Sequence, residues 1–95
     1  MVVSMLVIIL ELPESASLKD KRSVVSSVKR RLRTKFRFSC AEVDLLDSLA
    51  FAEIGAALVS NSKEFGESVM QKALAVVEDE YGIRVHDAQI FSETY

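Results

Sequence analysis

Apolar residues fill almost every position from Val2 to Leu12, and Pro13 follows at once. Because successive strand residues point to opposite faces, a run that is apolar on both faces predicts a central β-strand. Further along, apolar residues recur with the 3.6-residue period of an amphipathic helix that reaches about Lys35. Ser17 is a favourable N-cap for this helix, and Asp20 at the third helical position makes a weak capping box. The chain therefore opens with a strand and a helix.

A β-hairpin is predicted next. Residues 36 to 46 alternate between two faces, and residues 49 to 60 do the same after a tight turn at Asp47-Ser48. The uncharged face of the second strand, with its small side chains, is assigned to the core under the helices. Four side chains are expected on the opposite, open face, and we consider them interface candidates: Phe38, Phe51, Glu42 and Glu53.

A second helix and a last strand complete the pattern. The helix starts from a cap at Asn61 or Ser62, and residues 83 to 91 form a strand that is irregular around His86-Asp87. The order βαββαβ predicts a ferredoxin-like α+β sandwich with a four-stranded antiparallel sheet. Right-handed crossovers place both helices on one face of that sheet, so the other face is open or covered by a partner. The 95 residues form a single ferredoxin-like domain, 1–95, with no room for a second one.

Composition and motifs exclude several classes of protein. The single cysteine, Cys40, rules out an internal disulfide and a CxxC metal site. No apolar run approaches the roughly 18 to 20 residues that span a bilayer, and the first twelve residues lack the basic segment of a signal peptide. Neither a Walker A sequence nor GxGxxG, HExxH or a nucleophile elbow occurs. We therefore expect a cytoplasmic protein with no membrane contact, no metal, no cofactor and no enzymatic activity.

Charge is distributed unevenly along the chain. The formal net charge is −2, but residues 19 to 37 contain nine cations against Asp20 alone, a net of +8. The rest of the chain has three cations, Lys63, Lys72 and Arg84, against thirteen acids, a net of −10. The domain is thus expected to present one basic side and one acidic side.

The basic segment coincides with the first predicted helix. On a helical projection, five cations and two hydroxyls share one flank over about 24 Å, an arrangement that could follow a phosphate backbone. Lys21 sits nearer the apolar flank, where its ammonium could reach the same anion or a carboxylate. The candidates for phosphate or RNA binding are Lys19, Lys21, Arg22, Lys29, Arg30 and Arg33. Two other interpretations stay open: pairing with the acidic remainder within or between subunits, and a merely solvated helix face.

The hairpin offers two further kinds of chemistry. Its carboxylates could bind a divalent cation or act as an acid–base pair, but no nucleophile or histidine is predicted beside them. Phe38 and Phe51 on one face resemble the base-stacking aromatic residues of RNA-recognition motifs, yet the RNP1 pattern is absent. Glu42 and Glu53 would also repel phosphate. A packed dimer or partner surface is the better account of that face.

Several short segments, taken together, are distinctive: L-P-E-S-A-S-L-K-D-K-R at residues 12 to 22, K-F at 35 and 36, A-E-V-D at 41 to 44, and A-E-I-G…V-S-N-S between 52 and 62. Through them, and over essentially its full length, the chain resembles the YlxP-like family of small bacterial proteins, a family of unknown function. The resemblance implies a ferredoxin-like fold. Members are often encoded beside translation-initiation and ribosome-maturation genes, which implies a link to RNA or the ribosome. It supplies no catalytic residues, and after Asp44 this chain has L-L-D-S-L-A-F where a more polar or Trp-containing segment would be expected.

Two functional hypotheses follow from these patterns. The leading one is a cytoplasmic accessory protein that binds structured RNA or a ribosomal particle through its basic first helix. The alternative is a homo-oligomer, expected to be a dimer, that serves as a protein-interaction or ligand-sensing module. It would associate through the open sheet face or an edge strand.

Overall fold

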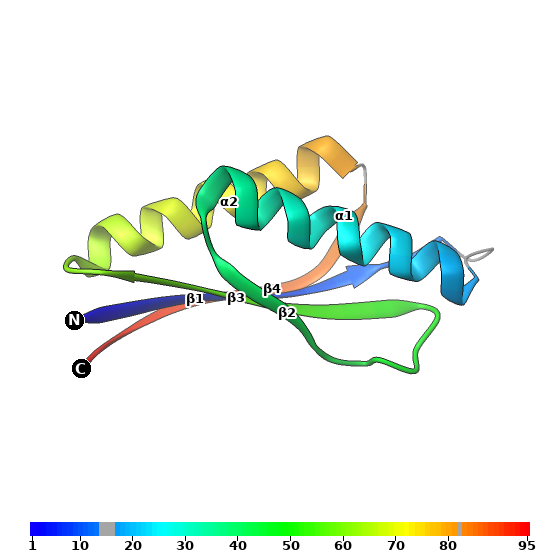
Figure 1. Ribbon diagram of the computed structural model, residues 1–95, viewed down its shortest axis with the longest axis horizontal. Coiled ribbons are helices and arrows are strands. Elements are labelled where there is room, and N and C mark those ends of the chain that lie inside the picture. Colours follow the sequence, from blue (N-terminus) through cyan, green and yellow to red (C-terminus); the bar gives the residue numbers. More distant parts are fainter. Residues whose placement is uncertain (14–16, 82) are drawn as a thin grey trace.

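Six elements succeed one another along residues 1–13, 17–81 and 83–95, which are the residues that the computed structural model describes. They are β1 (Val2–Glu11), α1 (Leu18–Phe36), β2 (Ser39–Asp44), β3 (Phe51–Ser60), α2 (Lys63–Tyr81) and β4 (Arg84–Thr94). The strands form one antiparallel sheet in the order β2-β3-β1-β4. Both helices lie over the same face of this sheet (Figure 1). The predicted ferredoxin-like α+β fold is confirmed.

β1 occupies the middle of the sheet because both of its faces are apolar. Its residues alternate strictly between buried and partly exposed side chains from Val2 to Glu11. It pairs with β3 along one edge and with β4 along the other. The buried side chains face the helices, and the partly exposed ones form the centre of the open side of the sheet.

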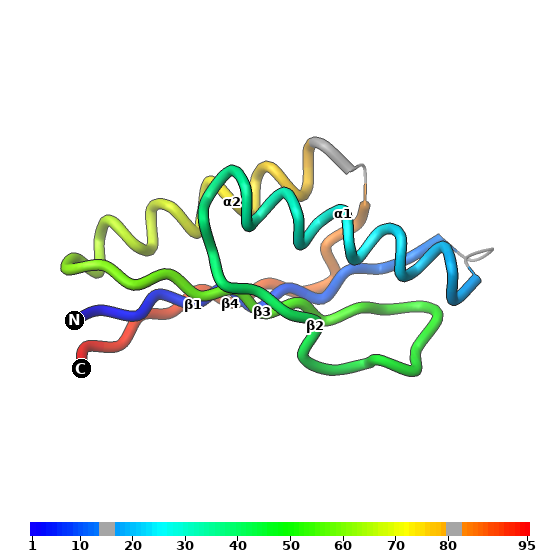
Figure 2. Tube along the Cα trace, viewed as in Figure 1, coloured from blue at the N-terminus to red at the C-terminus, as the bar shows by residue number. Residues whose placement is uncertain are grey.

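The two ends of the described chain meet at one end of the sheet (Figure 2). The ammonium of Met1 donates a hydrogen bond to the carbonyl oxygen of Tyr95 at 3.1 Å, and the Tyr95 amide donates to the Met1 carbonyl oxygen at 2.7 Å. These bonds extend the pairing of β1 with β4 beyond the last ladder residues.

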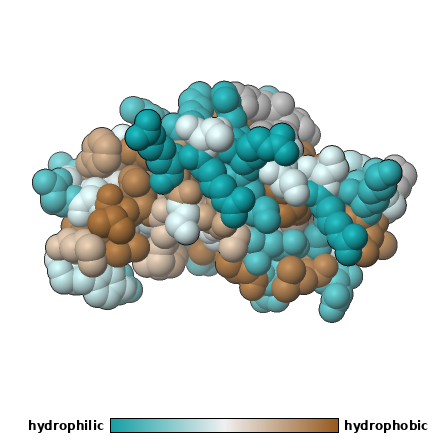
Figure 3. All heavy atoms as spheres, in the orientation of Figure 1, coloured by the Kyte–Doolittle hydropathy of each residue, from teal (hydrophilic) through white to brown (hydrophobic). Residues whose placement is uncertain are grey.

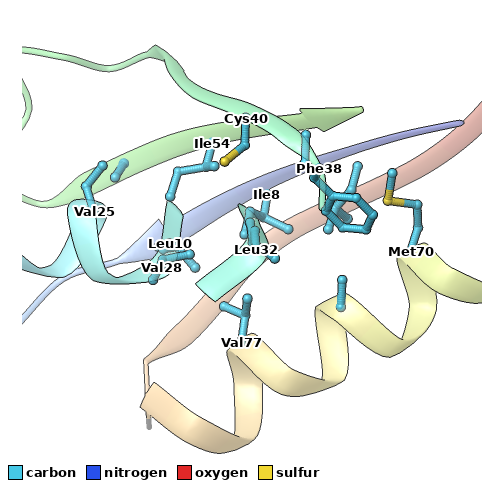
Figure 4. Close-up of a cluster of buried hydrophobic side chains, with 14 residues drawn as sticks. Ile8, Leu10, Val25, Val28, Leu32, Phe38, Cys40, Ile54, Met70 and Val77 are labelled. Carbon is cyan, nitrogen blue, oxygen red and sulfur yellow. The ribbon is translucent and has the colours of Figure 1, made fainter. Parts of the chain in front are cut away.

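The hydrophobic core fills the space between the sheet and the helices. Figure 4 shows Val28 and Leu32 of α1 and Val77 of α2 lying over Ile8 and other side chains of the sheet. The spacing of the apolar residues along α1 puts them on one stripe, which faces the sheet. The helical period read from the sequence therefore corresponds to the buried face.

α2 approaches the sheet closely at Gly66, near its N-terminus. A Cβ atom at this position would overlap the side chain of Ser4, which is completely buried on β1. The Ser4 hydroxyl lies 2.7 Å from the Ser92 hydroxyl, so the buried polar group has a hydrogen-bond partner. Gly66 is therefore required by a close approach between helix and strand rather than by its backbone dihedral angles.

Side chains cap both helices as the sequence predicted. At α1, the Asp20 amide donates to Ser17 Oγ and the Ser17 amide donates to Asp20 Oδ2, each at 3.1 Å, which completes the capping box. α1 ends at Phe36, and Arg37 follows it in the left-handed conformation with φ 59°. At α2, the hydroxyl of Ser62 accepts a hydrogen bond from the Phe65 amide at 3.2 Å. Of the two residues proposed as its cap, Ser62 performs this role.

The predicted placement of Phe38 and Glu42 on the open face is wrong. Phe38 is 4% exposed and stacks on Phe36 beneath the helices, with ring centroids 5.3 Å apart, as Figure 4 shows for its ring. Glu42 lies on the same side of the sheet, against α1. Because Ala41 and Val43 are also apolar, alternation along β2 could not tell which face is covered. The burial of the Phe38 ring under the helices determines which face of β2 is covered.

Two register shifts modify the sheet. Between Glu42 and Asp44 the pairing slips, so Asp44 lies directly opposite Glu53 on the open side. In β4 the register with β1 shifts at His86, between the paired residues Val85 and Asp87. This second shift confirms the irregularity predicted at His86-Asp87.

Candidate functional site

α1 turns a cationic flank away from the core. Its buried side chains are Lys21, Val25, Val28 and Leu32, and at 100° per residue an adjacent flank, turned mostly to solvent, holds the remaining predicted phosphate ligands. These ligands are Lys19, Arg22, Lys29, Arg30 and Arg33. Lys29 is partly buried, and the other four are exposed. Figure 3 shows hydrophilic side chains gathered across the helix layer. The structure thus brings five of the six predicted residues together on one surface, which we call the α1 cationic face.

The α1 cationic face has no acidic partner within ion-pair distance among the residues that the structure describes. Within the described ranges, the ion pairs shorter than 4.0 Å join Lys21 to Glu42 and Arg84 to Glu11, and neither involves this face. Asp20, the one acid of the segment, is engaged in the capping box, and its hydrogen bonds with the Ser17 backbone and hydroxyl lower its pKa. Described acids therefore do not neutralise the charge of the α1 cationic face through ion pairs.

Arg33 is the most firmly positioned cation of the face. Its Nη2 atom donates a hydrogen bond to the Cys40 carbonyl oxygen at 2.7 Å, which anchors the guanidinium to β2. A guanidinium has five N–H donors, so donors remain for an anion. An immobilised side chain loses less conformational entropy when it binds a ligand.

Lys21 does not belong to the α1 cationic face. Its side chain is 2% exposed, and its ammonium donates to three loop carbonyls, those of Leu45, Leu46 and Ser48, at 2.7, 3.3 and 2.6 Å. It also lies 3.2 Å from Glu42 Oε2. The three carbonyls and the carboxylate surround the ammonium and shield it from any phosphate backbone. The structure removes Lys21 from the predicted phosphate ligands and bears out the other option, pairing with a carboxylate.

This contact ties the start of α1 to the loop between β2 and β3, which runs beneath it (Figure 2). Leu45 in that loop has φ 60°, a left-handed conformation that is strained for leucine. Its carbonyl is one of the acceptors of the buried ammonium. The cation near the N-terminus of α1 therefore fixes the loop geometry.

The other side of the sheet is a half-exposed apolar surface. Phe51 and Glu53 lie on it, as the sequence predicted, and the Phe51 ring contacts the His86 ring with centroids 5.1 Å apart. No described helix covers this side (Figure 1). Its central apolar side chains come from β1, β3 and β4: Met5, Val7, Ile9, Phe51, Ala57 and Phe91. We call this surface the open sheet face.

Sequence reasoning placed Gly55 on the open side of its strand but missed Val43 on the open sheet face and its close approach to Gly55. Val43 is 52% exposed, and a Cβ atom on Gly55 would lie 3.1 Å from its Cγ1 atom. The available signal was the glycine itself, because glycine inside a strand marks a bulge or a close approach.

Apart from these two surfaces, the described residues form no reactive thiol site and no metal site. Cys40 is buried, its Sγ atom donates to the Lys29 carbonyl oxygen at 3.5 Å, and burial raises the pKa of its thiol. Among these residues, no group of three histidines, cysteines or acids could hold a metal ion. The described helices are also too short or too polar to cross a membrane.

Comparison with known proteins gives one family and one curated relative. The family model described as "Protein of unknown function (DUF503)" matches residues 3–90. The chain is 32% identical over 65 residues to "Uncharacterized protein YlxP" of Bacillus subtilis (strain 168), an alignment that covers 68% of this chain and 71% of the relative. Both findings agree with the resemblance carried by the short sequence segments.

Proposed function

The chain belongs to the DUF503 family of proteins of unknown function, and we propose that it is a non-enzymatic accessory protein that binds structured RNA, alone or within a ribosomal particle. The α1 cationic face is the proposed contact surface. The observation that carries the proposal is that its five cations share one exposed flank without acidic partners among the described residues.

The length and composition of this face suit a phosphate backbone. Lys19 and Arg33 are fourteen positions apart, or about 21 Å along a helix that rises 1.5 Å per residue. Lysine and arginine contacts to phosphates supply affinity and orientation without reading bases. The exposed hydroxyl of Ser26 lies on the same flank and can donate to a phosphate oxygen. The face would therefore hold RNA with little sequence preference.

Structured RNA fits the face better than single-stranded RNA does. Proteins that hold single strands stack bases on exposed aromatic side chains. The aromatic residue of α1, Phe36, is partly buried and stacked on Phe38, so α1 offers no such platform. RNA duplexes are recognised mainly by shape and by backbone contacts, which a rigid cationic helix can provide. The ribosomal form of the partner rests on the family resemblance.

A charge-reversal experiment tests the proposal. Binding of a fluorescently labelled RNA hairpin would be measured by anisotropy for the wild type and for the double variant Arg22→Glu/Arg30→Glu. Both residues are exposed, and a glutamate near the N-terminus of α1 is favoured by the helix dipole, so the variant should fold. The matched control is Lys63→Glu/Lys72→Glu, which makes the same charge change on the exposed surface of α2.

We expect the α1 variant to bind at least about tenfold more weakly, equivalent to about 1.4 kcal/mol, and the α2 control to bind nearly as the wild type does. Equal loss in both variants would mean that only net charge matters. Undetectable binding by the wild type, to hairpin and to purified ribosomal subunits alike, would refute the proposed function.

A further inference from the structure

The open sheet face has the character of an interior surface. Met5, Val7 and Ile9 on β1 are partly buried by their neighbours on the sheet, and no described helix lies over them (Figure 1). An apolar sheet face in a folded protein normally packs against a second layer. The chemistry of this face therefore indicates what kind of partner would cover it.

A hollow with a volume of about 310 Å³ lies on this face where β1, β3 and β2 meet. It exists because β3 has two small residues there, Gly55 and Ala57, beside the longer side chains of Met5, Val7 and Val43. Its lining is almost entirely apolar, so it can accept a side chain such as leucine from a partner.

A row of carboxylates borders the hollow on one side. Asp44 and Glu53 are direct cross-strand partners, Glu53 is paired with Ile9, and Ile9 with Asp87. Three acids thus cross the four strands in a single row. Like charges directly opposite one another destabilise a sheet, and in the described part of the chain none of the three acids forms an ion pair. A cation from outside would relieve this repulsion.

We propose that the open sheet face binds a basic amphipathic helix of another protein. An apolar side chain of that helix would enter the hollow, and its lysines or arginines would meet the carboxylate row. Gly55 and Glu53 are two residues apart, about 6.8 Å along a strand, and residues one helical turn apart (i, i+4) are separated by about 6 Å. A helix that runs along the strands can therefore place an apolar residue and a cation on both features at once.

A second copy of this chain is a poorer occupant of the face. Among the described residues, the basic side chains on this face are Arg84 and His86, and Arg84 is already paired with Glu11 at 3.3 Å. In a symmetric face-to-face dimer, each carboxylate row would meet either the other row or apolar residues. Neither arrangement supplies the missing cations, whereas a basic helix does.

This inference is independent of the proposed RNA contact, because α1 lies on the opposite side of the sheet (Figure 1). The probe is a synthetic amphipathic helix of about 18 residues composed of leucine and lysine at helical spacing. The control peptide has glutamate in place of every lysine. Binding to the full chain would be measured by fluorescence anisotropy and located by backbone amide NMR shifts.

Glu53→Lys is the informative variant, because it replaces a like-charge pair with an opposite-charge pair and so should fold at least as stably as the wild type. Its matched control is Glu67→Lys on the exposed surface of α2. We expect Glu53→Lys to weaken binding of the leucine–lysine peptide at least about tenfold, while Glu67→Lys leaves the affinity nearly unchanged. The amide shifts that the peptide causes in the wild type should be confined to the strands, including Val43 and Asp44 of β2.

Three results would overturn the inference. One is equal binding by the two variants, and another is equal binding of the glutamate peptide, which would indicate unspecific apolar contact. The third is the absence of binding at about 100 μM peptide. Sedimentation of the protein alone adds a check on the occupant, because a dimer dissociated by Met5→Lys would assign the face to a second copy instead.

Discussion

Lys21 is the residue whose environment departs most from its residue type. Lysine is almost never fully buried unless it is paired, and a cation near a helix N-terminus is disfavoured by the helix dipole. Here three loop carbonyls and the Glu42 carboxylate surround the ammonium. These partners offset both costs, and they make one side chain responsible for the position of a whole loop.

Replacing Lys21 with methionine should lower the free energy of unfolding by about 3 kcal/mol. Removing one partner of a buried pair costs about 3–5 kcal/mol, and we expect the low end because Glu42 keeps 17% of its side-chain surface in water. Urea denaturation measures the change. Lys19→Met, at an exposed position of the same helix, is the control and should change stability by less than about 0.5 kcal/mol. A loss below about 1 kcal/mol for Lys21→Met would contradict this account of the loop.

Gly66 gives a second prediction at a single position. Helix propensity alone favours alanine over glycine by about 1 kcal/mol, but a Cβ atom here would overlap the buried Ser4 hydroxyl. We expect Gly66→Ala to destabilise the protein by about 1–3 kcal/mol, the usual cost of overpacking. The measurement is again urea denaturation, with Ser68→Ala at an exposed position of α2 as control. A more stable Gly66→Ala protein would show that the helix does not approach the strand so closely.

Among the elements, β2 shows most clearly where sequence patterns stop being informative. β1 could be predicted because it is a long apolar run. Both helices could be predicted because their apolar residues recur over many turns and their N-cap residues are recognisable. In β2, apolar side chains occur on both faces, and the shift after Glu42 changes the face of Asp44. Which side of β2 is buried depends on its contacts with α1. Phe36 of α1 stacks on Phe38, and Lys21 of α1 forms an ion pair with Glu42. Contacts between elements that are distant in the sequence cannot be predicted from the local pattern of apolar and polar residues.

The capping box of α1 makes stability depend on pH. Hydrogen bonds from Ser17 hold the pKa of Asp20 below its ordinary value of 3.8. Because the folded-state pKa is lowered, the contribution of Asp20 is present above about pH 3.8 and is lost as the pH falls through the folded-state value. We expect Asp20→Asn to lower the thermal unfolding midpoint at pH 7 and to have a smaller effect at pH 2, as measured by circular dichroism. Glu67→Gln on α2 should show no such dependence, and a constant effect of Asp20→Asn at both pH values would contradict the assignment.

At the scale of the whole molecule, two surfaces of opposite character lie on either side of one sheet. The charge segregation was visible in the sequence as a segment of net charge +8 within a chain of net charge −2. The sequence did not show that Lys21 is withdrawn from the basic surface. It placed Asp44 and Glu53 on one face, but it did not show that they pair directly or that Asp87 extends them into a row. Those features depend on strand register and loop conformation, which arise only when distant segments pair. The fold itself followed from local periodicity.

The salt dependence of RNA binding tests the central claim most directly. Each phosphate contact contributes about −0.7 to −0.9 to the slope of log K against log salt concentration. The account predicts a steep slope for the wild-type protein, a slope shallower by about 2 for Arg22→Glu/Arg30→Glu, and an unchanged slope for Lys63→Glu/Lys72→Glu. Equal slopes for the wild type and the α1 variant would show that the exposed cations of α1 do not contact phosphates.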